Sequence, residues 1–286
     1  MSHFSVLVIG EDVDKQLAPY DETLETTPRR EYLGVAAIKL MANHYGLDRT
    51  DLPALAEKMA EWKACPGGVD AEGLYALTSY NSNAKWDWYE VGGRWTGFFH
   101  LKTKRVAHAR GKDTKDRGAE ISPTRADTAL KSEIDFESMR EVAEERAREV
   151  WRVYAAAIAG TPEPLSADHF VGKVRARKLT VAAAHKAYRA QPRVLAFQKA
   201  MEPFLGPFAQ LDEFPRSEED YVGQERRAAV TPFAYVQGGV WHERGEMGWF
   251  AHVANERPES EWYEEVQAVL AALPDDTVLT LVDCHV

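Results

Sequence analysis

Cysteine is scarce in this chain. Only Cys65 and Cys284 occur among its 286 residues, and they lie far apart in the sequence. A protein held together by disulfides needs more cysteines than this, and disulfides persist mainly in oxidising compartments. The sequence therefore favours a reducing compartment, and we expect a cytoplasmic protein.

Long apolar runs are also lacking. No stretch approaches the ~20 consecutive apolar residues that a membrane-spanning helix requires. The first residues show no basic region followed by an apolar segment and a small-residue cleavage site, as a secretory signal would. We expect no membrane span and no membrane partner.

Positive charge is in deficit. The chain has 35 Lys and Arg against 45 Asp and Glu, a formal net charge of −10, whereas a general nucleic-acid-binding protein carries an excess of Lys and Arg. The segment 166–201 departs from this balance and reads as basic helices interrupted at Pro192. We interpret it as a solvated helical face, with an anion-binding face as the alternative. Its basic residues are Lys173, Arg175, Arg177, Lys178, Lys186, Arg189, Arg193 and Lys199.

The motifs of several well-known catalytic centres are missing as well. The chain contains no Gly-x-Ser-x-Gly, no His-Glu-x-x-His and no Cys-x-x-Cys. The sequence on its own therefore does not specify a reaction. Its 45% hydrophobic and 28% charged residues are ordinary for a globular protein long enough to bury a core.

What the chain does contain is a dense aromatic stretch from Trp86 to Trp95, which reads Trp-Asp-Trp-Tyr-Glu-Val-Gly-Gly-Arg-Trp. Three of the eight tryptophans of the chain fall within it. Together with Thr96–Leu101, it predicts two strands joined by a tight turn at Gly92 and Gly93. No other segment concentrates so much recognition chemistry.

These residue types suit the binding of an anionic ligand that has a planar ring. Arg94 can present its guanidinium to a phosphate or carboxylate, and it is a candidate catalytic residue together with Asp87, a possible general acid or base. The glycines allow close backbone approach, and the tryptophans can stack on the ring. Alternatively, the tryptophans pack in the core and Arg94 forms a salt bridge. The candidate ligand-binding residues are Trp86, Trp88, Gly92, Gly93 and Trp95.

A second Gly-Gly turn follows later in the chain. Phe233–Gln237 and Val240–Glu243 flank Gly238-Gly239 and predict another hairpin. Beyond it, Glu246 is a further candidate general acid or base, and Trp249 is a further candidate ring for ligand stacking. We expect these two residues to complete the site around the tryptophan-rich stretch.

Residues at the two ends of the chain form a candidate metal site. Alternation along the last strand places Asp283 and His285 on one face, and His3 opens the first strand. These residue types suit a divalent metal, the one cofactor that the sequence indicates. If the two terminal strands pair antiparallel, we expect the ends that carry His3 and His285 not to meet. If the strands run parallel and adjacent, His3 lies near one end of the pair and His285 near the opposite end. The metal cluster therefore forms in only some strand orders. The alternative is a terminal strand with a solvated His and Asp.

Apolar patterns predict an α+β protein, with an antiparallel sheet and helices packed on one face. The near-continuous apolar strand Phe4–Ile9 should be covered on both faces. The element order suits a ferredoxin-like β-α-β-β-α-β core within a single domain spanning 1–286, with a mainly helical insertion over 127–202. Expected helices cover Tyr32–Tyr45, 52–64, Asp135–Ala159, the region 166–201 and Pro258–Leu273; 203–231 is a connecting segment, and Thr277–His285 is the last strand.

Several of these motifs resemble those of a group of proteins from tailed bacteriophages, prophages and bacteria. No activity is established for the group, so the resemblance implies a phage or prophage setting and no mechanism. It also implies that the motif residues, including Asp283-Cys284-His285, meet in space. The matching segments are Ser2–Gly10, Gln16–Tyr20, Lys85–Tyr89, Gly92–Trp95, Gly245–Trp249, Leu273–Thr277 and Val282–His285.

Three functions compete on this sequence. The first is an enzyme of hydrolase or transferase type that acts on a nucleotide or another phosphate-bearing small molecule, with a divalent metal assisting. The second is a protein-interaction factor of phage type that binds a host protein without catalysis. The third is nucleic-acid binding through the helices of 166–201, which the acidic balance disfavours. The expected partner is therefore a small anionic ligand or a host protein.

Overall fold

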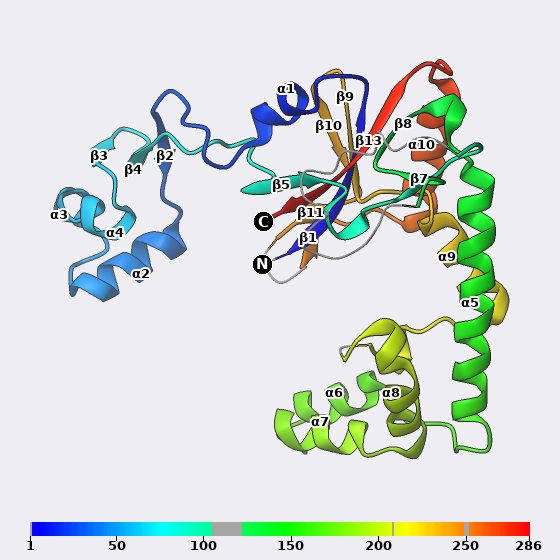
Figure 1. Cartoon of the computed structure of the whole chain (residues 1–286). Helices are drawn as coiled ribbons and strands as arrows, with labels where there is room; N and C mark the ends of the chain where they lie inside the picture. The colour runs from blue at the N-terminus through cyan, green and yellow to red at the C-terminus, as the bar shows by residue number, and fades with distance from the viewer. Residues whose placement is uncertain (1, 105–121, 208, 249–251) are drawn as a thin grey trace. The chain divides into compact units, whose positions relative to one another are not determined.

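The computed structural model describes residues 2–104, 122–207, 209–248 and 252–286, and its helices and strands confirm the α+β class. The chain divides into two compact units, whose helices and strands are labelled in Figure 1. Unit 1 comprises Met1–Trp95, Ala234–Glu256 and Thr280–Val286, and unit 2 comprises Thr96–Phe233 and Arg257–Leu279. The segment 127–202, expected as a helical insertion, lies wholly within unit 2.

The central element of unit 1 is a mixed β-sheet with the strand order β10-β9-β1-β13-β5. β1 and β9 run parallel, whereas β9 pairs antiparallel with β10 and β13 pairs antiparallel with β5. The strands cover His3–Ile9 (β1), Trp88–Val91 (β5), Ala234–Gln237 (β9), Val240–Glu243 (β10) and Val278–His285 (β13).

This strand order differs from the ferredoxin-like core that the sequence suggested. In that core the second strand of the internal hairpin lies beside the first strand of the sheet and antiparallel to it. Here the first strand of the hairpin, β9, takes this position beside β1, and the sheet is mixed rather than wholly antiparallel. Element order alone could not reveal this, because the long excursion of the chain between β1 and β9 permits a return in either direction.

Apolar residues on both faces explain why β1 and β13 lie in the middle of the sheet. From Phe4 to Ile9 every residue except Ser5 is buried, which confirms the expectation of a strand covered on both faces. From Leu279 to Cys284 every residue of β13 is buried. This run includes one carboxylate, Asp283, whose partners are described below.

The second of the two expected hairpins is confirmed. β9 and β10 pair antiparallel, with Gln237 opposite Val240. Between them, Gly238 and Gly239 have φ angles of 59° and 78°. Two consecutive residues with positive φ are what a two-residue hairpin turn requires, and glycine adopts them without steric cost.

The first expected hairpin is wrong. β5 pairs with β13, and the next strand along the chain, β6 (Phe99–His100), pairs with β7 (Arg125–Ala126) in unit 2. Instead of turning back, the chain passes from Gly92 into the 3-10 helix η2 (Gly93–Trp95). The backbone N–H of Trp95 donates to the carbonyl of Gly92 at 2.8 Å and closes this turn. β13 supplies the backbone hydrogen bonds that β5 would otherwise receive from a hairpin partner.

A smaller α+β part of unit 1 spans residues 29–78. It has three antiparallel strands in the order β2-β4-β3, and its helices enclose a core of Met41, Ala42, Leu55, Met59, Leu74 and Ala76. Asp51 caps α3 by accepting the N–H of Ala54, and Gly46, with φ of 64°, ends α2. The elements cover Arg29–Tyr32 (β2), Val35–Tyr45 (α2), Leu52–Glu57 (α3), Met59–Lys63 (α4), Gly67–Asp70 (β3) and Gly73–Thr78 (β4); α1 (Val13–Leu17) and η1 (Ala18–Tyr20) precede them.

Unit 2 is mainly helical. Its longest helix, α5, begins at Phe136 because the side chain of Asp135 accepts the N–H of Ser138, and it ends at Ile158, in agreement with the expected helix. α5 packs on α8 and α9 around the buried residues Ala147, Val150, Phe197, Met201, Phe214, Tyr221 and Val222. The elements cover Thr128–Leu130 (β8), Lys131–Glu133 (η4), Phe136–Ile158 (α5), Ala167–Arg175 (α6), Val181–Arg189 (α7), Pro192–Leu205 (α8), Leu211–Glu213 (η5), Glu218–Ala228 (α9) and Glu259–Ala272 (α10).

Helix α9 falls inside the segment 203–231, where the sequence predicted only a connection. Ser217 caps its start by accepting the N–H of Asp220. Acidic residues fill the first turn, and Arg226 and Arg227 fill the last, which suits the helix dipole. The prolines that suggested a connection, Pro203, Pro207, Pro215 and Pro232, all lie outside this helix.

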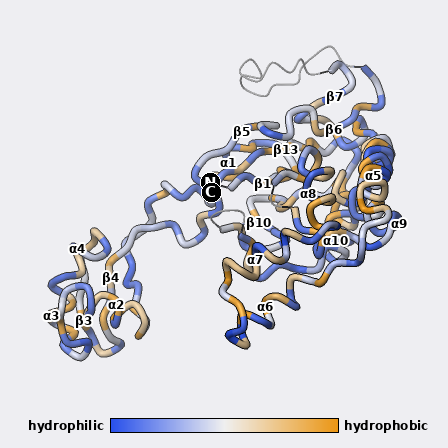
Figure 2. The backbone as a smooth tube through the Cα atoms, turned by 90° about the horizontal axis from the view of Figure 1, so that it is seen from below, coloured by the Kyte–Doolittle hydropathy of each residue, from blue (hydrophilic) through white to orange (hydrophobic). Residues whose placement is uncertain are grey.

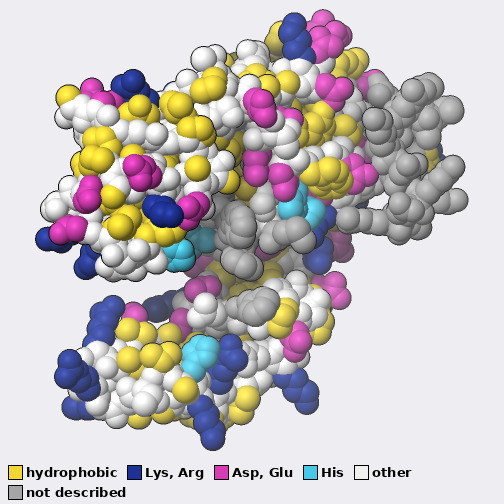
Figure 3. All heavy atoms as spheres, turned by 90° about the vertical axis from the view of Figure 1, so that its left-hand side faces the viewer, with side chains coloured by type: hydrophobic (Ala, Val, Ile, Leu, Met, Phe, Trp, Pro, Cys, Tyr) yellow, Lys and Arg dark blue, Asp and Glu magenta, His cyan; other side chains and the backbone are white. Residues whose placement is uncertain are grey.

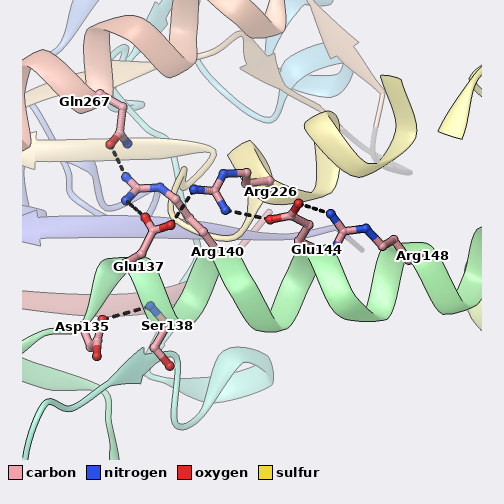
Figure 4. A network of polar contacts seen from close by, with 8 residues as sticks. All are labelled: Asp135, Glu137, Ser138, Arg140, Glu144, Arg148, Arg226 and Gln267. Carbon is pink, nitrogen blue, oxygen red and sulfur yellow. Dashed lines mark hydrogen bonds and ion pairs between the residues drawn. The ribbon is translucent and has the colours of Figure 1, made fainter. Parts of the chain in front are cut away.

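Charged side chains join the helices of unit 2 (Figure 4). Arg226 of α9 contacts Glu137 at 2.6 Å and Glu144 at 2.8 Å, both on α5. Arg140 of α5 donates to Oε1 of Gln267 on α10 at 2.6 Å and contacts Glu137 at 3.4 Å. Arg226 and Arg140 thus both have acceptors within the unit.

The described helices alternate hydrophilic and hydrophobic stretches along their length (Figure 2). Within the described residues, none of them is both long enough and apolar enough to pass through a lipid bilayer. The longest, α5, has Glu and Arg residues along most of its length.

Candidate functional site

The candidate site lies in unit 1, where the start of β1, the end of β13 and the start of β5 lie side by side. Ser2 and Val286 exchange backbone hydrogen bonds of 2.9 and 3.0 Å, so β1 and β13 run antiparallel and His3 lies opposite His285. β5 pairs on the other side of β13, with Trp88 opposite His285. The expectation that antiparallel pairing separates the ends was wrong, because antiparallel strands bring the start of one beside the end of the other.

The first polar pair of the site joins His3 to Asp283. Nδ1 of His3 lies 2.8 Å from Oδ1 of Asp283, and the aspartate side chain is fully buried. Its second oxygen, Oδ2, accepts the backbone N–H of Arg94 at 2.9 Å. Because a carboxylate can only accept, His3 donates its Nδ1–H, and the neutral ring then keeps its lone pair on Nε2.

The second polar pair joins His285 to Asp87. Nδ1 of His285 lies 2.6 Å from Oδ1 of Asp87. The histidine side chain is 12% exposed and the aspartate side chain 40% exposed, so this pair lies closer to solvent than the first. The rings of His3 and His285 meet edge to face, with centroids 4.9 Å apart. Two imidazoles therefore lie in contact, each held at Nδ1 by its own carboxylate.

Gly93 allows the turn after β5 to reach Asp283. Its φ angle is 49°, and a Cβ atom built on it would lie 2.3 Å from Cβ and 2.5 Å from Oδ2 of Asp283. No side chain fits in that space, and the backbone conformation also favours glycine. The tight approach places the N–H of Arg94 on the buried carboxylate. The close approach expected of the Gly-Gly pair thus occurs, but toward β13.

Of the predicted recognition groups, Trp88 borders the histidine pair and Arg94 contacts Asp283 through its backbone. The indole of Trp88 is 47% exposed, and its ring centroid lies 6.3 Å from that of His3. Arg94 is exposed, and within the described part of the chain its guanidinium has no ion-pair partner. An exposed aromatic ring therefore lies next to the two imidazoles, and Arg94 follows the turn that contacts Asp283 through its backbone N–H.

Trp86 and Trp95 are less exposed than Trp88. Trp86 is buried, its Nε1–H donates to the carbonyl of Leu17 at 3.2 Å, and it packs edge to face on Tyr89. Trp95 is half-buried in η2. The core-packing alternative therefore describes Trp86, which has no surface to offer a ligand.

Glu246 lies on a short hairpin of β11 (Glu246–Met247) and β12 (Val253–Ala254). Ser2 Oγ donates to the carbonyl of Gly248 at 3.0 Å, which brings this hairpin beside the start of β1. Glu246 is exposed and forms no ion pair among residues 2–104, 122–207, 209–248 and 252–286. Trp249 lies outside the described residues.

The three predicted metal ligands His3, Asp283 and His285 do come together. Each histidine, however, directs Nδ1 toward a carboxylate, and no set of three or more His, Cys, Asp or Glu side chains in the described chain is placed to hold a metal ion. Their geometry is that of two hydrogen-bonded pairs. The pairing of His285 with Asp87 was not foreseen, because only the strand order places β5 beside β13.

The neighbouring groups on the opposite face of the sheet are poor reactants. Burial raises the pKa of the Cys284 thiol well above its usual range, and the nearby charge of Asp283 raises it further. Burial also raises the pKa of Tyr89, as does its hydrogen bond to Asp14. A thiol with a raised pKa is protonated near neutral pH and is a weak nucleophile. The reactive groups of this site are therefore the imidazoles.

Comparison with protein-family models, with curated proteins and with solved structures finds no match to the chain. The geometry of the residues therefore carries the functional argument.

Proposed function

We propose that this protein is a hydrolase or transferase that acts on a nucleotide or another phosphate-bearing small molecule by general acid–base catalysis. The observation that carries the proposal is the contact between His3 and His285, with ring centroids 4.9 Å apart. Each ring is oriented by a carboxylate at Nδ1, at 2.8 and 2.6 Å. With Nδ1 engaged in this way, Nε2 is the atom of each ring that is left for proton transfer.

The chemistry needs the two imidazoles in different protonation states. The neutral one accepts a proton at Nε2 from the attacking water or hydroxyl group, and the protonated one donates its Nε2 proton to the leaving oxygen. The carboxylates of Asp283 and Asp87 hold the rings in the required tautomer and stabilise the positive charge as it forms. At the end of the reaction the two histidines have exchanged roles, and transfer of a proton through water restores them.

Arg94 and Trp88 supply the recognition of the ligand. A guanidinium binds phosphate oxygens through paired N–H donors and keeps its charge at all physiological pH values. The exposed face of Trp88 can stack on a planar ring such as a nucleobase. These two groups favour a ligand that combines an anion with an aromatic ring. A phage or prophage setting, which the sequence resemblance implies, is part of this proposal.

Assay of the purified protein against nucleotides, phosphomonoesters and phosphodiesters tests the proposal. His3→Asn and His285→Asn should each lower kcat by about 10²–10⁴-fold, the usual contribution of a positioned acid or base. His169→Asn is the matched control, because His169 is an exposed histidine in unit 2. Turnover that is the same in all three variants would remove the proposal. Elemental analysis of the same preparation tests the divalent metal predicted at His3, Asp283 and His285.

A further inference from the structure

Unit 2 contains a cleft that the proposed reaction does not use. It has a volume of about 520 Å³ and is formed by α6, α7, α8 and residues 207 and 209–211. Its apolar lining includes Phe170, Val171, Val181, Ala184, Val194 and Leu211. Val181 is 70% exposed and Val171 41% exposed, so part of this lining is open to solvent. An apolar cleft of this size can take several large side chains.

The rim of the cleft is positively charged. Arg175, His185 and Arg189 line the same cavity and are exposed. Within the described chain none of these three has an ion-pair partner, in contrast to Arg226, whose guanidinium contacts two glutamates. Figure 3 shows Lys and Arg side chains bordering hydrophobic ones on the helical part that holds α6, α7 and α8. The unmatched charge is local, because the whole chain has a formal net charge of −10.

We propose that this cleft binds an acidic amphipathic helix of a partner protein. Such a helix would place apolar side chains from one face, spaced three and four residues apart, into the cleft, and this is a recurrent mode of peptide recognition. Its carboxylates would lie against Arg175 and Arg189 and supply the missing counter-charges. The proposal concerns unit 2 and stands independently of the reaction proposed for unit 1.

The observations favour a protein helix over a nucleic acid. DNA and RNA bind basic surfaces through their phosphates, and the basic segment 166–201 supplies the charge for that. They do not need open valines between the arginines, and a double helix has no side chain to fill a cleft of about 520 Å³. An acidic amphipathic helix uses both features at once.

Fluorescence anisotropy tests the proposal with the full-length protein. The probe is a labelled peptide of about five helical turns, with Leu on one face and Glu on the other. A second peptide has the same Leu spacing with Lys in place of Glu, and a third probe is a labelled DNA duplex. We expect saturable binding of the acidic peptide, weaker binding as salt rises, and at least roughly tenfold weaker binding of the basic peptide.

Two variants locate the binding site. Val181→Asp places a charge at the mouth of the cleft and should weaken binding of the acidic peptide by roughly tenfold or more. Val181 is the first residue of α7, where an acidic side chain suits the helix dipole, so the fold should tolerate the change. Val35→Asp is the matched control, because Val35 is likewise an exposed first residue, of α2 in unit 1.

The double variant Arg175→Gln, Arg189→Gln should also weaken binding and reduce its salt dependence, with Arg49→Gln as the control. Circular dichroism and thermal unfolding establish that each variant is folded. Absence of acidic-peptide binding, equal binding of the basic peptide, or full binding by Val181→Asp would each overturn the proposal. Tighter binding of the DNA duplex that Val181→Asp leaves unchanged would assign the surface to nucleic acid instead.

Discussion

A Cβ atom on Gly93 would lie 2.3 Å from the Cβ atom of Asp283. Gly93→Ala should therefore destabilise the protein by about 2–5 kcal/mol, since it adds a steric clash to the cost of a positive φ. Gly46→Ala is the control, because Gly46 has a φ of 64° and a Cβ atom there would meet no other atom within 4 Å. That variant should lose about 1–2 kcal/mol, the cost of the backbone alone. Urea unfolding followed by circular dichroism measures both, and equal losses would contradict the close approach.

Asp283→Asn should lower kcat by about 10²–10⁴-fold, because the amide keeps the shape of the carboxylate but no longer holds His3 in one tautomer. Asp87→Asn should have a smaller effect, since the Asp87 side chain is 40% exposed and water can replace part of its role. The measurement is kcat and KM as functions of pH for both variants. Because the aspartates act through the histidines, the pH profile should change along with the rate. A profile like that of the unmodified protein would point to a purely structural role.

Arg94→Ala separates the two roles of this residue. Its backbone N–H, which donates to Asp283, is kept, so the free energy of unfolding should stay the same. Its guanidinium is lost, so the dissociation constant of a phosphate-bearing ligand should rise by about 10–100-fold, as for a lost hydrogen bond to a charged group. Arg49→Ala controls for the loss of one exposed positive charge. Isothermal titration calorimetry gives the constants, and unchanged affinity in Arg94→Ala would exclude it from the ligand site.

The carboxyl group of Asp127 should make the stability of unit 2 depend on pH. Its side chain is buried, which raises the pKa of the carboxyl even though Oδ1 accepts the backbone N–H of Gly97. A raised pKa means that the folded protein holds the proton more tightly. The contribution of Asp127 to stability is therefore fully present below the unfolded pKa of about 3.9, and it is lost as pH rises through the raised value.

Asp127→Asn removes this loss. The free energy of unfolding of the variant should therefore rise relative to that of the unmodified protein as pH increases, and the difference should become constant above the raised pKa. Asp48→Asn should show the opposite slope, because a hydrogen bond from the backbone of Thr50 lowers the pKa of Asp48. Urea unfolding at a series of pH values measures both differences. A flat difference for Asp127→Asn would show that this carboxyl is not perturbed.

Local signals predicted the elements that depend on neighbouring residues. Helix α5 followed from an uninterrupted amphipathic pattern, and the β9–β10 hairpin from a Gly-Gly pair between two apolar strands. The same reasoning failed for Gly92 and Gly93, because the partner of β5 lies far along the chain. Val282, for example, pairs with Val91. α9 was missed because prolines near it outweighed its own caps.

The same contrast holds for the candidate site: local patterns identified its residues, but not their hydrogen-bonding partners. Alternation along a strand correctly placed Asp283 and His285 on one face, and the residue types correctly marked His3 as a possible neighbour. Their hydrogen-bonding partners depend on strand order and register, which no local pattern encodes. The sequence therefore indicated a metal cluster where the structure has two His–Asp pairs. Trp86 is buried and Trp88 is exposed, although both belong to the same motif.

The antiparallel pairing of β1 and β13 also determines when the site can form during synthesis. His3 and Asp283 are 280 residues apart in the chain. The ribosome therefore releases His3 long before it adds Asp283, and β1 emerges before β13 exists to pair with it. A product of premature termination before Asp283 would lack that carboxylate and His285 together. Incomplete chains therefore have no paired histidines, and the site appears only when translation has passed through β13.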